Sequence, residues 1–121
     1  MIHATESLST VLGDDVVVGH GARLEGCVIE DASLIGMGAI VLHEVRIGRG
    51  AAVAAGAVVT PRTQVPPGAM ALGVPARVRE AEDEQARETR MQMHLLTSAL
   101  YAENARRWME SAELCSVEEA T

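Results

Sequence analysis

Aliphatic residues recur with a period of six through the first half of the chain. Eight consecutive units each begin with Leu, Val or Ile, and each has a small or β-branched residue at its fifth position. The second position is Gly in half of the units, with Leu42 as a misfit, and the unit 24–28 is one residue short. A period of six matches neither an α-helix nor a simple alternating strand. The units begin at Leu12, Val18, Leu24, Ile29, Ile35, Val41, Ile47 and Val53.

This pattern predicts short strands separated by sharp corners. One aliphatic side chain per strand points inward and stacks on its equivalent in the next coil, about 4.8 Å away. Gly at the second position is expected to supply corner backbone angles that a Cβ would forbid. A core filled in this way needs few aromatic residues, and the chain has one Tyr, one Trp and no Phe.

The spacing is similar to that of hexapeptide-repeat proteins. The resemblance implies a mainly β fold, a left-handed parallel β-helix with three units in each triangular coil. Eight units make fewer than three coils, a stack only about 14 Å tall. Because so short a prism buries little surface, we expect it to be supported by a C-terminal α-helix and by association into a homotrimer, which the resemblance also implies.

Proline and glycine residues between 61 and 78 mark the expected end of the repeat, because proline cannot sit in a central ladder. We divide the chain into a β-helix over residues 1–78, with its exit loop at 61–78, and an α-helical segment over residues 79–121. Apolar residues of that segment share one helical stripe, which predicts packing along the prism or across the trimer. The stripe comprises Met91, Leu95, Ala99, Ala102, Trp108, Met109 and Ala112.

Charge and composition exclude several classes of function. The net charge is −7, with acidic residues concentrated between 80 and 88, so nucleic-acid binding is excluded and the acidic cluster is interpreted as a solvated helix face. No apolar run approaches the roughly 20 residues of a membrane span, and the first residues do not form a signal peptide. Two distant cysteines, Cys27 and Cys115, favour a reducing cytoplasm, with Cys27 inside the prism.

The segment 18–41, VGHGARLEGCVIEDASLIGMGAIV, closely resembles the γ-class carbonic anhydrase family, and the strings at 65–78 and 101–108 add to the resemblance. In that family, histidines stand at the positions of His3, His20 and Glu25. The resemblance implies that these three residues bind one divalent metal between subunits. His3 and Glu25 of one chain would then face His20 of the adjacent chain.

Such a ligand set suits a catalytic metal. Three protein ligands leave a fourth position open for water, and the metal lowers the pKa of that water so that it can attack CO2. Glu25 replaces a histidine, which keeps a workable ligand but adds a negative charge. Zinc is therefore expected, with iron or cobalt as alternatives. The competing interpretation is that Glu25 is only an ordinary second-position residue of the repeat.

Compared with the family, the chain is shortened at its N-terminus and has no match for the Arg-x-Asp element that orders the active-site water. No catalytic residue is assigned. The open edge of the prism invites pairing with another chain, so we expect either two stacked trimers or a separate polypeptide that caps it. His43 is interpreted as a surface residue and His94 as a packing residue of the helix.

Three functions remain open from the sequence. The first is a γ-carbonic-anhydrase-like lyase that hydrates CO2 weakly. The second is an acyltransferase of the hexapeptide group that uses an acyl-CoA. The third is a non-catalytic trimeric scaffold that has lost its metal site.

Overall fold

A computed structural model describes residues 1–111, so Ala112 and Cys115 lie outside the described residues. Thirteen short strands precede one long helix among these residues. They are β1 (Ile2–His3), β2 (Val11–Leu12), β3 (Val17–Val18), β4 (Arg23–Glu25), β5 (Val28–Ile29), β6 (Leu34–Ile35), β7 (Ile40–Val41), β8 (Arg46–Ile47), β9 (Ala52–Val53), β10 (Val58–Val59), β11 (Gln64–Val65), β12 (Met70–Leu72), β13 (Arg77–Arg79) and α1 (Glu84–Ser111).

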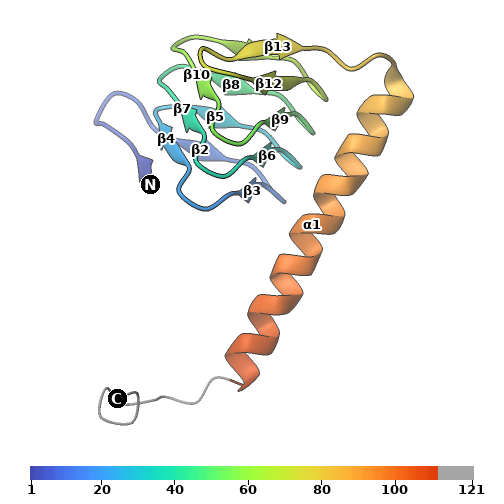
Figure 1. Cartoon of the computed structure of the whole chain (residues 1–121). Helices are drawn as coiled ribbons and strands as arrows, with labels where there is room; N and C mark the ends of the chain where they lie inside the picture. Colours follow the sequence, from blue (N-terminus) through green and yellow to red (C-terminus); the bar gives the residue numbers. More distant parts are fainter. Residues whose placement is uncertain (112–121) are drawn as a thin grey trace.

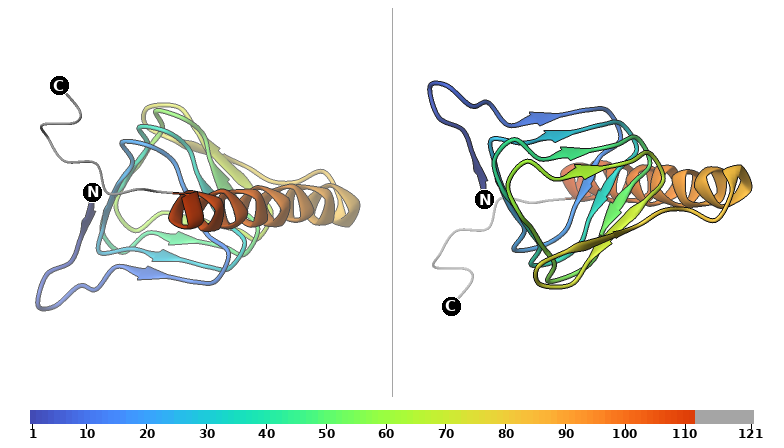
Figure 2. Two further views of the ribbon diagram at one scale, coloured as in Figure 1. Left: turned by 90° about the horizontal axis from the view of Figure 1, so that it is seen from below. Right: turned by 90° about the horizontal axis from the view of Figure 1, so that it is seen from above.

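The strands form three sheets (Figure 1), which are the faces of a prism that is triangular when seen along its axis (Figure 2). Face A contains β1, β4, β7 and β10; face B contains β2, β5, β8 and β11; face C contains β3, β6, β9, β12 and β13. Every pairing is parallel except that of β13 with β12. Seen along its axis in Figure 2, the chain winds as a left-handed coil. The predicted left-handed parallel β-helix followed by a helix is confirmed.

The prism is taller than the sequence analysis predicted. Four coils are present rather than fewer than three, because β11 and β12 lie within the expected exit loop at 61–78 and pair with β8 and β9. Pro61, Pro66 and Pro67 fall in the turns between strands, where no ladder donor is required. Proline therefore interrupts the sequence pattern here without interrupting the ladder.

The core is a set of aliphatic columns that run along the prism. On face B, the column contains Leu12, Ile29, Ile47 and Val65, which are register partners from one coil to the next. Ile29, Ile47 and Val65 are fully buried, whereas Leu12 in the first coil is 39% exposed. Main-chain hydrogen bonds between coils, such as Glu30 N to Ile47 O at 2.9 Å, fix the spacing of the columns.

Left-handed backbone angles occur at the fourth position of the units, not at the second. Ala32 and Glu44, for example, have φ angles of +55° and +59°. At the second position, glycine is favoured for a different reason, since a Cβ on Gly36 would lie 2.5 Å from the backbone nitrogen of Ala55 in the next coil. The expectation about second-position glycine is therefore corrected: close backbone approach requires it there.

Helix α1 runs back along the corner between faces B and C (Figures 1 and 2). Asp83 caps its start, with Oδ1 accepting a hydrogen bond from Ala86 N at 2.7 Å. The helix then approaches one fourth-position residue in each coil: Arg87 and Arg90 at Gly68, Met91 at Gly50, His94 at Ala32 and Ser98 at Asp15.

This contact face differs in part from the predicted stripe. Met91 belongs to both, but Ala99 and Ala102 are exposed, while the polar His94 is the one buried residue of the described helix. The prediction that the helix packs along the prism is confirmed. Its face was misassigned because the helix uses polar residues, His94 and Ser98, to bond with the corner of the prism.

Candidate functional site

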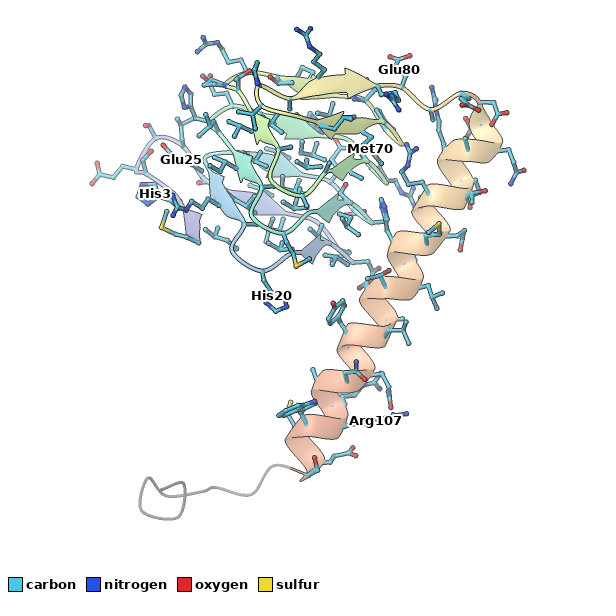
Figure 3. The ribbon with its side chains drawn as sticks, in the orientation of Figure 1. His3, His20, Glu25, Met70, Glu80 and Arg107 are labelled. Carbon is cyan, nitrogen blue, oxygen red and sulfur yellow. The ribbon has the colours of Figure 1, made fainter. Side chains whose placement is uncertain are left out.

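His3 and Glu25 lie side by side on face A. Strands β1 and β4 pair in parallel, and their register places His3 directly opposite Glu25. Register partners on neighbouring parallel strands project to the same side of a sheet, with backbones about 4.8 Å apart. Both residues are exposed in the single chain, and Figure 3 shows them together at one side of the prism.

The backbone around this pair is held by Thr10. Its hydroxyl donates a hydrogen bond to His3 O at 2.5 Å and accepts one from Gly26 N at 2.8 Å. The loop that follows β1 is thereby tied to the residue that follows Glu25. This arrangement fixes the relative height of the two strands, and with it the register that sets His3 opposite Glu25.

His20 lies apart from this pair. It follows β3 in the turn between faces C and A, whereas His3 and Glu25 lie at the far ends of their face-A strands (Figure 3). Its carbonyl accepts a hydrogen bond from Gly38 N at 2.9 Å, and its side chain is exposed. Within the described part of one chain, no three His, Cys, Asp or Glu side chains are grouped closely enough to hold a metal ion. Three ligands therefore require a second chain.

Glu30, an acidic residue near the predicted site, is occupied by structural contacts. One carboxylate oxygen accepts a hydrogen bond from Arg46 Nε at 2.6 Å, and the other accepts one from Arg49 N at 2.9 Å. Glu30 thus ties two neighbouring coils together on face B. It is committed to the prism rather than placed beside His3 and Glu25.

His94 packs between α1 and the second coil, as predicted. Its Nδ1 lies 3.0 Å from the carbonyl oxygen of Ala32, a geometry in which Nδ1 carries the proton and donates. Burial lowers the pKa of His94, and the nearby charge of Arg90 acts in the same direction, while the bond to Ala32 opposes them. The ring is therefore neutral at neutral pH and serves as an anchor of the helix.

The remaining two predictions on single side chains concern Cys27 and His43. Cys27 is fully buried in the prism, as predicted, and burial raises the pKa of its thiol. A protonated, enclosed thiol is a packing residue. His43 is half-buried rather than fully on the surface, because its Cβ stacks over Gly26 in the neighbouring coil.

A groove between α1 and face C was missed by the sequence analysis. It encloses about 860 Å³ and is lined by outward-facing residues of face C, such as Val17, Leu34 and Met70, with His94 and Tyr101 from the helix. His20 lies at its margin. The signal in the sequence was the run of apolar residues at the sixth, outward position of the face-C units, which is unusual for a solvated face.

The coils and the repeat define the class of protein, a left-handed β-helix of the hexapeptide-repeat kind. The model of the bacterial transferase hexapeptide family (six repeats) matches residues 26–61. A solved structure from Bacillus cereus, assigned to the acetyltransferases, superimposes with a TM-score of 0.68 and 33% identity, covering 83% of this chain and 60% of that chain.

Curated relatives give a more particular placement. The mitochondrial gamma carbonic anhydrase 1 of Arabidopsis thaliana is 46% identical over 77 residues, which are 63% of this chain and 28% of the relative. A 2,3,4,5-tetrahydropyridine-2,6-dicarboxylate N-acetyltransferase of Staphylococcus aureus is 46% identical over 81 residues, covering 60% of this chain and 33% of the relative. Over its coils the chain is therefore a hexapeptide-repeat protein that is similar to a gamma carbonic anhydrase and to an N-acetyltransferase alike.

The chain matches at most a third of the length of these two curated relatives. The similarity thus rests on the coils, and the activities of the relatives belong to longer chains. The described part of the chain contains no helix that is both long and apolar enough to cross a bilayer.

Proposed function

We propose that this protein is a metal-dependent, γ-carbonic-anhydrase-like lyase that acts as a homotrimer in the cytoplasm. In this proposal, His3 and Glu25 of one chain and His20 of the next hold a divalent metal, with zinc first and iron or cobalt as alternatives. The observation that carries the proposal is the β1–β4 register, which sets His3 opposite Glu25 on an exposed face.

The donor set fits a divalent metal of this kind. Imidazole nitrogen and carboxylate oxygen both bind zinc at about 2.0–2.2 Å, and two neighbouring strands present one of each. His20 lies in the first coil of the prism, as His3 does, but at a different corner. The third donor must therefore come from a neighbouring chain. When bound, such a metal supplies Lewis-acid activation of a water molecule, the chemistry that hydration of CO2 requires.

Glu25 determines how strongly that chemistry develops. A carboxylate in place of a neutral imidazole removes one unit of positive charge from the site, so a water held there is less acidic than with three histidines. Weak CO2 hydration is therefore the expected activity of this chain. The exchange Glu25→His is expected to increase it.

Metal analysis of the purified trimer tests the proposal directly. We expect one divalent metal per chain, retained after desalting, and its loss in His3→Ala and His20→Ala. The matched control is His43→Ala, which removes an imidazole from the neighbouring coil outside the ligand set. If the wild type and Glu25→His both bind no metal, the metal site is refuted, and the non-catalytic scaffold becomes the better account.

An acyltransferase is the second candidate function, and the groove beside α1 favours it. Its volume of about 860 Å³ and its apolar lining suit a slender chain such as that of an acyl-CoA, with His20 at its margin to act as a general base. Isothermal titration with acetyl-CoA separates the two candidates. Saturable binding that is lost when Leu34→Trp fills the groove supports the acyltransferase, and absence of binding removes it.

A further inference from the structure

The groove between α1 and face C has a floor that is more apolar than the outer surface of the other two faces. The outward side chains of this floor are register partners from one coil to the next, and each of them is apolar. We call this set the face-C column; it comprises Val17, Leu34, Ala52 and Met70. The equivalent columns include Arg46 on face B and Arg23 on face A. A contiguous apolar surface of this kind marks a site of interaction.

The walls of the groove also favour an uncharged occupant. Among the described residues, no Asp, Glu, Lys or Arg lines the groove. A carboxylate or phosphate placed there would lose water without gaining a cation, and an ammonium group would lose water without gaining a carboxylate. The volume of about 860 Å³ is typical of sites for small molecules. The groove therefore suits a small, uncharged and largely apolar ligand.

His94 presents one unpartnered hydrogen-bond acceptor on the same side of the helix. Its side chain is only 7% exposed and lines the groove. Because Nδ1 donates to Ala32 O at 3.0 Å, Nε2 of the neutral ring carries a lone pair and can only accept. Within residues 1–111, Nε2 has no hydrogen-bond partner, and no side-chain nitrogen is both enclosed and unpartnered. Nε2 therefore keeps contact with open space, and the open space that the ring borders lies on the face-C side of α1.

We propose that this groove binds a neutral, apolar alcohol or phenol. The apolar body of the ligand covers the face-C column, and its hydroxyl group donates a hydrogen bond to His94 Nε2. The same geometry disfavours two other classes of ligand. Ethers and ketones have no donor for Nε2, while an ionised carboxylate has no donor and also brings a charge into an uncharged groove.

This inference goes beyond both candidate functions and does not depend on the metal site. The ligand contacts face C and α1, whereas His3 and Glu25 lie on face A. Loss of metal in His3→Ala should therefore leave ligand binding unchanged, and failure of ligand binding leaves the metal site standing. The acyltransferase candidate places a thioester in the same groove, and a thioester has no hydrogen-bond donor for His94. Recognition of a hydroxyl group thus separates this inference from that candidate.

Isothermal titration of the full chain with three probes of equal size tests the inference. The probes are 1-octanol, its isomer 1-methoxyheptane, which lacks the hydroxyl group, and octanoate, which is charged. We expect saturable binding of 1-octanol. Binding of 1-methoxyheptane should be about fivefold weaker, because one hydrogen bond to Nε2 is lost. Octanoate should bind more weakly than 1-methoxyheptane, because its charge finds no partner in the groove.

Three variants assign the preference to the groove and to His94. In His94→Asn, the amide nitrogen can still donate to Ala32 O, but no atom remains at the position of Nε2, so the preference for 1-octanol over its isomer should disappear. His43→Asn is the matched control, because His43 lies between β7 and β8, outside the groove, and it should keep the preference. Leu34→Trp should abolish binding of all three probes, because the larger side chain fills the groove.

Three results would overturn the inference. The first is a wild-type protein that does not bind 1-octanol, which is also the result expected if a neighbouring chain covers the face-C column. The second is equal affinity for 1-octanol and 1-methoxyheptane. The third is an unchanged preference in His94→Asn. Thermal unfolding shows whether His94→Asn is folded, and if it is not, the comparison of the two isomers on the wild type still decides.

Discussion

Removing the side chain of Ile47 should destabilise the prism more than the same change at the end of its column. Ile47 is fully buried between Ile29 and Val65 on face B. Ile47→Ala deletes three carbons, and the coils on either side cannot collapse, because main-chain hydrogen bonds of 2.8–2.9 Å hold Glu30, Ile47, Gly48 and Val65 at ladder spacing. The cost should therefore fall in the upper part of the usual range, about 3–5 kcal/mol.

Urea unfolding at one fixed chain concentration measures this cost, since the stability of an assembling protein depends on concentration. With a slope of about 1–3 kcal/mol/M, the midpoint should fall by about 1 M or more. Leu12→Ala, measured under the same conditions, is the control. Leu12 is 39% exposed at the end of the same column, so its cost should be about half as large. Equal costs at the two positions would refute the stacked column as the source of stability.

Three other measurements test the contacts of the helix and of the coil edges. Burial depresses the pKa of His94 in the folded state, so the stability contributed by its neutral form is complete above the ordinary histidine pKa of about 6.5 and is lost as the pH falls through the lower folded pKa. His94→Gln should therefore flatten this part of a curve of stability against pH. An unchanged curve would contradict the assignment of His94 as a buried, neutral anchor. Gly68→Ala should increase amide exchange in the first turns of α1, because the backbone at Gly68 has a left-handed φ of +70° and a Cβ there would lie 2.6 Å from Arg87 Cγ. Gly56→Ala is the control, since the backbone at Gly56 is also left-handed but a Cβ there would meet nothing, and it should leave exchange in α1 unchanged. Glu30→Gln should cost less than about 1 kcal/mol in thermal unfolding, because its partner Arg46 is 56% exposed; a larger loss would show that this pair matters more than its exposure indicates.

The fold was predictable because one physical constraint recurs in every coil. Each strand needs one inward aliphatic residue, and positions such as Ile35 and Ile47 supply it at fixed spacing. The fourth coil was missed because proline was treated as a ladder breaker, although Pro61 and Pro66 occupy turns. The helix stripe was misassigned because hydrophobicity alone does not identify a contact made by His94 through a hydrogen bond.

The candidate site was predictable only in part. The resemblance to carbonic anhydrases pointed to His3 and Glu25, and the β1–β4 register does bring them together. The sequence could not show how far His20 lies from His3 and Glu25 within one chain. That distance depends on the corner of the prism at which each residue lies. Whether three donors meet depends on a second chain, which neither the period of six nor the composition specifies.

The match between the turn of α1 and the rise of the coils limits how this architecture can change in length. Each helical turn of about 5.4 Å faces one coil of about 4.8 Å, so contacts such as Met91 with Gly50 and His94 with Ala32 repeat along a single corner. Inserting one six-residue unit would rotate everything after it by a third of a revolution and move the helix to a different corner. Inserting three units returns the chain to the same corner and shifts the helix by one turn. Insertions and deletions of eighteen residues, together with one helical turn, are therefore the changes in length that this protein can accommodate.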